Sequence, residues 1–152
     1  MTATSHDIST LNTLIASALD SMDCYIAAAD DTRSEQLGGL FRARAYERGI
    51  VAHSFQVHVS RLGGKPADGG TLLAGAHRVF MNLKGAVTGK DVQAIVSEVE
   101  RGEGHIKAKF ETALKDDTLS APVKATIETG FASVDEGYGQ IRALRHSLAA
   151  HV

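Results

Sequence analysis

The apolar residues of this chain recur every three or four positions through its whole length, and no segment alternates with the period of a β-strand. The clearest case is residues 92–114, where one stripe is formed by Val92, Ile95, Val96, Val99, Ile106, Phe110 and Leu114. Apolar residues at this spacing lie on one face of an α-helix and need other helices to cover them. The sequence therefore predicts an all-α protein.

One position of that stripe carries a charge. Between Val99 and Ile106 the helical register falls on Gly102 or Glu103, so a carboxylate appears in a face that points to the core. A buried carboxylate requires an opposite charge, a bound cation or a raised pKa, because burying the charge alone is costly. The partner of Glu103 is therefore the first question about function that the sequence raises.

Three more amphipathic stretches predict long helices. Asp7 is the expected N-cap of the first, and Thr32 with Glu35 has the spacing of a capping box before the second. The expected extents are about 7–30, about 35–62, and from Ser120-Ala121-Pro122 to just before Val152. With residues 92–114, these stretches predict one domain, residues 1–152, built from four long helices.

The link between the second and third long helices is much longer than the other two. It has 28 residues, Gly63–Lys90, and begins with a glycine-rich segment that ends the second helix. Apolar residues from Leu72 to Val87 then predict a shorter helix. A helix of roughly 17 residues is about 25 Å long, enough to carry the chain along one edge of a bundle. The second and third long helices are thus expected to be parallel, as in a ferritin-like four-helix bundle with a long crossover containing a short extra helix.

The composition excludes several classes of partner. The net charge of -2 and the mixing of acidic and basic residues leave no basic patch for nucleic acid. No apolar run approaches the roughly 20 residues that span a bilayer, and no basic amphipathic helix indicates binding to a membrane surface. Cys24 is the only cysteine, and Met1–Thr10 lacks the pattern of a signal peptide, so a cytoplasmic location is expected.

Several motifs follow one another along the chain: Arg61-Leu62-Gly63-Gly64-Lys65-Pro66, Ala74-Gly75-Ala76-His77-Arg78, Asn82-Leu83-Lys84, Glu100-Arg101-Gly102-Glu103 and Ile141-Arg142-Ala143-Leu144-Arg145. On these motifs the chain resembles the DUF2383 family of bacterial ferritin-like four-helix-bundle proteins, which have no established activity. The resemblance implies the fold, and it implies almost nothing about function.

A metal-loaded ferritin-like bundle takes Glu from two helices and Glu-x-x-His from the other two. In this chain the residue three positions after Glu47 is Ile50, and the one after Glu100 is Glu103. The usual di-iron centre is therefore not predicted. We expect no cofactor and no catalytic residue, and a protein that is not an enzyme is the favoured interpretation.

Two hypotheses for Glu103 stay open. In the first, Arg48 of the second helix pairs with it, since a guanidinium suits a bidentate contact with a carboxylate. Asp23 is then either a third member of this polar core or a solvated residue at the bundle edge. Tyr138 is either a core residue or a hydrogen-bond donor to the same site. In the second, carboxylates hold a divalent metal or a small ligand: Glu100, Glu103, Asp23 and Asp135.

Two further expectations concern packing. The glycines inside the predicted helices each cost up to about 1 kcal/mol relative to Ala, so they are expected to allow close helix packing or to leave room for a small ligand: Gly102, Gly104, Gly130, Gly137 and Gly139. The crossover helix and the outer faces of the long helices, notably Val79, Phe80 and Met81, carry more apolar surface than four helix seams need. This surplus predicts a homo-oligomer, at least a dimer.

Overall fold

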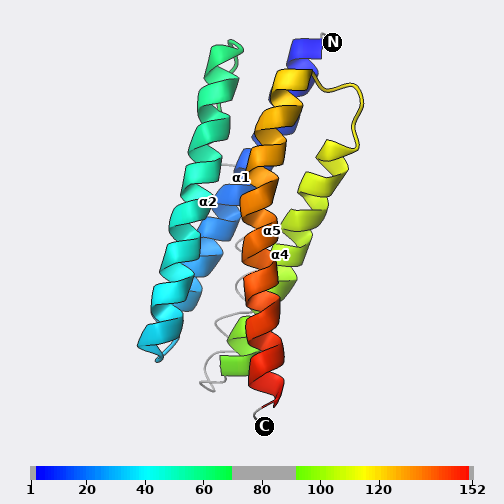
Figure 1. The fold of residues 1–152 in the computed structure, drawn as a ribbon. Helices are drawn as coiled ribbons and strands as arrows, with labels where there is room; N and C mark the ends of the chain where they lie inside the picture. Colours follow the sequence, from blue (N-terminus) through cyan, green and yellow to red (C-terminus); the bar gives the residue numbers. More distant parts are fainter. Residues whose placement is uncertain (1–2, 70–91, 151–152) are drawn as a thin grey trace.

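The computed structural model describes residues 3–69 and 92–150 of the chain, and these residues form four α-helices and no strand (Figure 1). The helices are α1 (Ala3–Asp31), α2 (Glu35–Arg61), α4 (Val92–Leu114) and α5 (Ala121–Ala150). The predicted all-α class and the four long helices are confirmed. The short helix expected over 72–87, and the apolar residues Val79, Phe80 and Met81, lie outside the described residues.

The helices pack in pairs, α1 against α2 and α4 against α5, and each pair is antiparallel (Figure 1). The start of α1 lies beside the end of α4, because His6 is hydrogen-bonded to Asp116, so α1 and α4 are also antiparallel. It follows that α2 and α4 run in the same direction. Among the described residues these two helices have no close backbone approach, which makes them diagonal partners across the bundle.

Capping residues fix both ends of α2, although not in the way that the sequence predicts. The N-cap is Ser34, whose hydroxyl accepts a hydrogen bond from Leu37 N at 3.1 Å. Thr32 instead accepts from Ser34 N, so the predicted Thr32 cap is wrong by two residues. Serine directly before the first helical residue reaches the free amide of the first turn, whereas Thr32 lies too far upstream. At the other end, Gly63 adopts a φ of 85° and closes the helix in a Schellman turn.

Asp7 also differs from the prediction. α1 begins at Ala3, five residues before Ile8, where a helix capped by Asp7 would begin, and the Asp7 side chain is buried within it. Its Oδ1 accepts a hydrogen bond from Ser120 N at 3.1 Å, immediately before the first residue of α5. Asp7 thus places a negative charge at the N-terminus of a different helix, where free amides and the helix dipole favour it.

The apolar core is divided into two clusters along the bundle. One contains Leu14, Phe55, Phe110 and Ile127 among others, and the second contains Tyr25, Phe41, Val96 and Ile141. Between them each helix contributes a residue that is not apolar. The core is therefore interrupted at mid-height by a polar layer.

No helix within residues 3–69 and 92–150 combines the length and the apolar character that a membrane span requires.

The buried face of α1 differs from the stripe that its apolar residues predict. Apolar residues spaced three or four apart predict a stripe that includes Leu11, Ile15, Leu19, Met22 and Ile26. Ile26 is nevertheless 43% exposed, whereas Leu14, Ala18 and Tyr25 are buried. The buried stripe of α1 includes a polar residue, Ser21. It is therefore rotated relative to a stripe made of apolar residues alone.

Candidate functional site in the polar layer

The polar layer is formed by four residues, one from each helix: Ser21, Arg48, Glu103 and Gly137. Arg48 is 0% exposed and Glu103 is 2% exposed, so both charges lie entirely inside the bundle. Each residue occupies the step of its helix where the two apolar clusters meet. The sequence pattern placed Arg48 between Ala45 and Val51, and Glu103 between Val99 and Ile106, for the same reason.

A closed set of hydrogen bonds satisfies the two charges. Arg48 Nη2 donates to Glu103 Oε2, and Arg48 Nε donates to Ser21 Oγ at 3.2 Å. The Ser21 hydroxyl in turn donates to Glu103 Oε1 at 2.8 Å. Both carboxylate oxygens are thereby occupied. Because Arg48 comes from α2 and Glu103 from α4, the pair joins the two helices that are diagonal across the bundle.

Gly137 of α5 provides the space that this pair needs. A Cβ atom at Gly137 would lie 2.6 Å from Arg48 Nη2 and 3.3 Å from Glu103 Oε2. Arg48 Nη1 also reaches the backbone of α5, where the Ser133 carbonyl accepts at 3.5 Å. α5 therefore contributes a carbonyl oxygen and the space that the absence of a side chain at Gly137 leaves. These two features let a guanidinium lie against its backbone.

Aromatic and thiol groups line the α1 side of the layer. The Arg48 guanidinium lies 5.9 Å from the centre of the Tyr25 ring, a cation–π contact. Burial raises the pKa of the Tyr25 phenol well above its ordinary value, and the nearby Glu103 carboxylate adds to the rise. Burial also raises the pKa of the Cys24 thiol, again with Glu103 adding to it. Both groups stay protonated at neutral pH, so neither is an activated nucleophile.

A second polar group lies beside the layer, between α2 and α5. Arg44 is 7% exposed, and its Nη2 donates to Glu47 Oε1 at 3.1 Å. The Ser133 hydroxyl donates to the other oxygen of Glu47 at 3.3 Å. A Cβ at Gly137 would also come within 3.3 Å of Arg44 Nη1. The glycine thus accommodates two arginines.

Two members of the predicted polar core, Arg48 and Glu103, lie together in the structure. Their hydrogen-bonded companion is Ser21. Asp23, two residues further along α1, is half-buried and lies near enough to Asp20 to raise its pKa. Tyr138 is half-buried at the rim, where Lys107 Nζ lies 4.9 Å from the centre of its ring.

The carboxylates of the alternative metal site do not come together. Glu100 forms an ion pair with Arg145, and Asp135 forms one with Lys107 at 3.1 Å, both away from Glu103. Within residues 3–69 and 92–150 there is no group of three or more His, Cys, Asp or Glu side chains able to hold a metal ion. The described residues therefore provide no support for a metal site built from Glu100, Glu103, Asp23 and Asp135. The physical reason is that basic residues of α4 and α5 pair with two of these carboxylates, Glu100 and Asp135.

The interior next to the pair has no room for a ligand. A small void lined by Ser21, Cys24, Val99 and Ile106 is too narrow to admit a water molecule. The helical glycines differ in their surroundings. A Cβ at Gly130 would lie 2.6 Å from Phe55 Cζ, so this glycine permits close helix packing. A Cβ at Gly139 would meet nothing within 4 Å, so close packing does not require this glycine.

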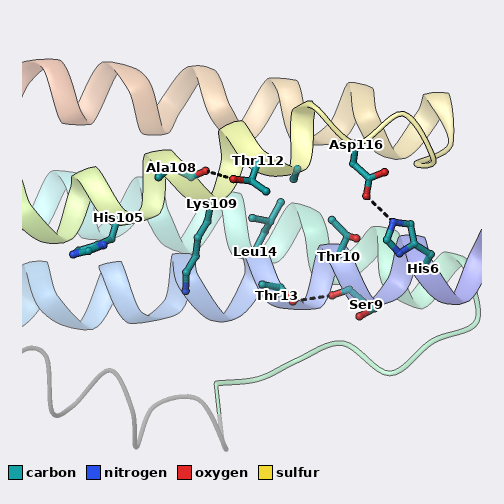
Figure 2. Close-up of a pocket in the computed structure, with 11 residues that line it drawn as sticks. His6, Ser9, Thr10, Thr13, Leu14, His105, Ala108, Lys109, Thr112 and Asp116 are labelled. Atoms are coloured by element: carbon teal, nitrogen blue, oxygen red, sulfur yellow. Dashed lines mark hydrogen bonds and ion pairs between the residues drawn. The ribbon is translucent and has the colours of Figure 1, made fainter.

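A hollow lined by side chains from both helix pairs lies at the surface, between α1 and α4, with a volume of about 470 Å³ (Figure 2). Some of its polar groups are paired with one another: His6 Nε2 is hydrogen-bonded to Asp116 Oδ2 at 2.7 Å, and the Thr112 hydroxyl donates to the Ala108 carbonyl. The Thr118 hydroxyl, the His6 imidazole and the Thr118 amide lower the pKa of Asp116 to about 2. The groove therefore stabilises the α1–α4 contact.

Two residues of the layer were not anticipated. Ser21 lies in helical register between Ala18 and Tyr25, so the same search for polar residues in apolar stripes that found Glu103 could have found it. Gly137 was recognised as costly in a helix, but its role depends on which side chain faces it. Only the packing of α5 against α2 supplies that information.

Comparison with known proteins identifies the family. The DUF2383 domain of unknown function matches residues 6–116, which contain Ser21, Arg48 and Glu103. The segment 141–145, one of the motifs on which the resemblance rests, lies beyond the matched region, as does Gly137. No curated protein matches the chain. Because the match covers well over half of the sequence, the chain belongs to the DUF2383 family.

Proposed function

We propose that this protein is a non-catalytic, ferritin-like helical bundle that acts as a self-associating structural module. In it a buried arginine–glutamate pair takes the place where metal-loaded ferritin-like bundles hold their ions. The parallel direction of α2 and α4 supports the ferritin-like topology, because a link between parallel helices must travel the length of the bundle.

The observation that carries the proposal is the saturation of Glu103. One of its oxygens accepts from Arg48 and the other from Ser21, and the whole side chain is 2% exposed. A metal ion would have to displace a guanidinium that is itself 0% exposed, leaving an unpaired positive charge beside the positive ion. The pair is thus a structural element of the core.

Metal analysis and thermal unfolding test the structural role. Protein purified without an affinity tag is expected to contain no stoichiometric divalent metal, and a chelator is expected to leave its melting temperature unchanged. A melting temperature that falls with chelator and recovers with one particular divalent metal would overturn the proposal. Glu103→Gln serves as the matched variant, since loss of a metal ligand would remove that chelator response.

Self-association is tested separately, by light scattering over a range of protein concentrations. The module is expected to be at least a dimer. A monomer at high concentration would remove self-association from the proposal and leave the role of the ion pair standing.

A further inference from the structure

The α1–α2 pair carries exposed large apolar side chains. They are Tyr46 (73% exposed) and Ile50 (52%) on α2, and Ile26 (43%) on α1. α1 and α2 are tightly packed at this level, because a Cβ at Gly49 would lie 3.3 Å from the Met22 sulfur. The outer surface of the α1–α2 pair thus carries an apolar patch that the bundle core does not use.

These residues of α2 belong to a regular row. Steps of four and three residues connect a series on the face opposite the core, here called the outer seam: Gly39, Ala43, Tyr46, Ile50, His53, Val57 and Ser60. All are exposed except Val57, which is half-buried. Alternating steps of four and three are the spacing of a coiled-coil seam, and α2 has a first such seam facing the core. A second seam on the same helix indicates a second helical neighbour.

The outer seam is also depleted of charge. Between Ala43 and Ser60 the exposed residues of α2 are Ala, Tyr, Ile, His and Ser, and the exposed charges of the helix lie towards its ends, at Glu35, Arg42 and Arg61. α5, by contrast, exposes charged residues along its middle, including Glu128, Asp135 and Glu136. An uncharged centre with a charged rim is the composition of a protein–protein interface.

We propose that the outer seam packs against the outer seam of a second copy, with the two α2 helices antiparallel. This inference rests on the proposed self-association and names its surface. An antiparallel seam is self-complementary in size: Tyr46 meets Ile50 of the second copy, and the small Gly39 and Ala43 meet the larger Val57 and His53. The helix ends then place Glu35 opposite Arg61, whereas a parallel arrangement would place Arg61 against Arg61.

The dimensions suit a stable dimer. Residues 39–60 extend over about 32 Å of helix. With the neighbouring surface of α1 around Ile26, a contact of this length approaches the roughly 800 Å² per partner that standard interfaces bury. Since both copies use the same surface, the contact is closed by a two-fold axis and predicts a dimer without further growth.

Sedimentation equilibrium of the full chain tests the location of the interface. Ile50→Asp is expected to convert the dimer to a monomer, raising the dissociation constant by at least about 100-fold. Ala132→Asp, which adds the same charge at an exposed position of α5, is expected to leave the dimer intact. Circular dichroism of both variants verifies that the monomer is folded.

Charge exchange tests the direction of the helices. Glu35→Arg is expected to raise the dissociation constant about 10-fold, and the double variant Glu35→Arg with Arg61→Glu is expected to restore it. A dimer that resists Ile50→Asp would overturn the outer seam while leaving self-association in place. A monomeric wild type whose melting temperature falls in Ile50→Asp would also overturn it, because the face would then be covered by the same chain.

Discussion

Among the side-chain pairs that join different parts of this bundle, Arg48–Glu103 and His6–Asp116 lie at very different depths. Arg48 and Glu103 meet at the centre, with side chains 0% and 2% exposed, whereas His6 and Asp116 meet at the end of the α1–α4 groove, 37% and 29% exposed. The central pair has Ser21 to complete its hydrogen bonds, and the peripheral one has Thr118. Similar chemistry is thus placed in two environments.

The comparison separates the cost of burying a charge from the benefit of pairing it. At the groove, water replaces a lost partner, so the pair contributes little to stability. At the centre no water can enter, so each charge depends on the other. The buried pair therefore fixes which residues of α2 and α4 face each other, in a core that is otherwise apolar on both sides.

The largest effect is expected from breaking the central pair. Arg48→Met leaves Glu103 buried without its counter-charge, a change that costs on the order of 3–5 kcal/mol of the free energy of unfolding. Thermal and denaturant unfolding measure this loss. The double variant Arg48→Met with Glu103→Leu is expected to recover most of it, because neither charge then remains. If the double variant were as unstable as the single one, the pair would not be the source of the loss.

The next effect comes from the space that the central pair occupies. Gly137→Ala forces a Cβ to within 2.6 Å of Arg48 Nη2, so we expect a loss of about 1–3 kcal/mol from overpacking. Gly139→Ala is the matched control two residues away in the same helix, where a Cβ meets nothing within 4 Å. It is expected to gain up to about 1 kcal/mol in helix propensity. Equal effects of the two variants would contradict the role assigned to Gly137.

Asp20 is an intermediate case, a partly buried carboxylate of α1. Burial raises its pKa to about 6, with Lys109 opposing and Asp23 adding to the rise, and its Oδ1 has no hydrogen-bond partner. Because the pKa of this carboxyl is higher in the folded protein than in the unfolded chain, its contribution to stability is fully present below about pH 4. That contribution is lost as the pH rises through 6. Asp20→Asn is therefore expected to stabilise by about 1 kcal/mol at pH 8, a value reduced for solvent screening, and by nothing at pH 3.5. A constant difference across this range in unfolding experiments would refute the assignment.

The smallest effect is expected at the groove. The pKa of Asp116 is lowered to about 2, so its contribution to stability is present above about pH 4 and is lost as the pH falls through 2. Asp116→Asn should lower the melting temperature slightly at pH 7 and match the wild type near pH 2. Asp117→Asn, at a neighbouring carboxylate whose side chain is 97% exposed, should change neither value.

Local pattern was sufficient for much of this fold. The four long helices, their approximate ends and the inward direction of Arg48 and Glu103 all follow from apolar residues three or four positions apart, because a single helix determines which of its own residues share a face. The same reasoning failed where partners are distant in sequence. Asp7 has the composition of a cap for its own helix, yet its carboxylate is used by Ser120, 113 residues away.

The sequence by itself determined that a carboxylate had to be compensated inside an all-α core, since the cost of a buried charge does not depend on its partner. Only the tertiary structure decided the means of compensation. Which helices are diagonal, and how they are rotated, made Ser21 the companion of Arg48 and Glu103 and gave Glu100 and Asp135 basic partners of their own. Gly137 shows the same division: its cost in a helix can be read locally, whereas its use depends on the guanidinium that α2 brings against it.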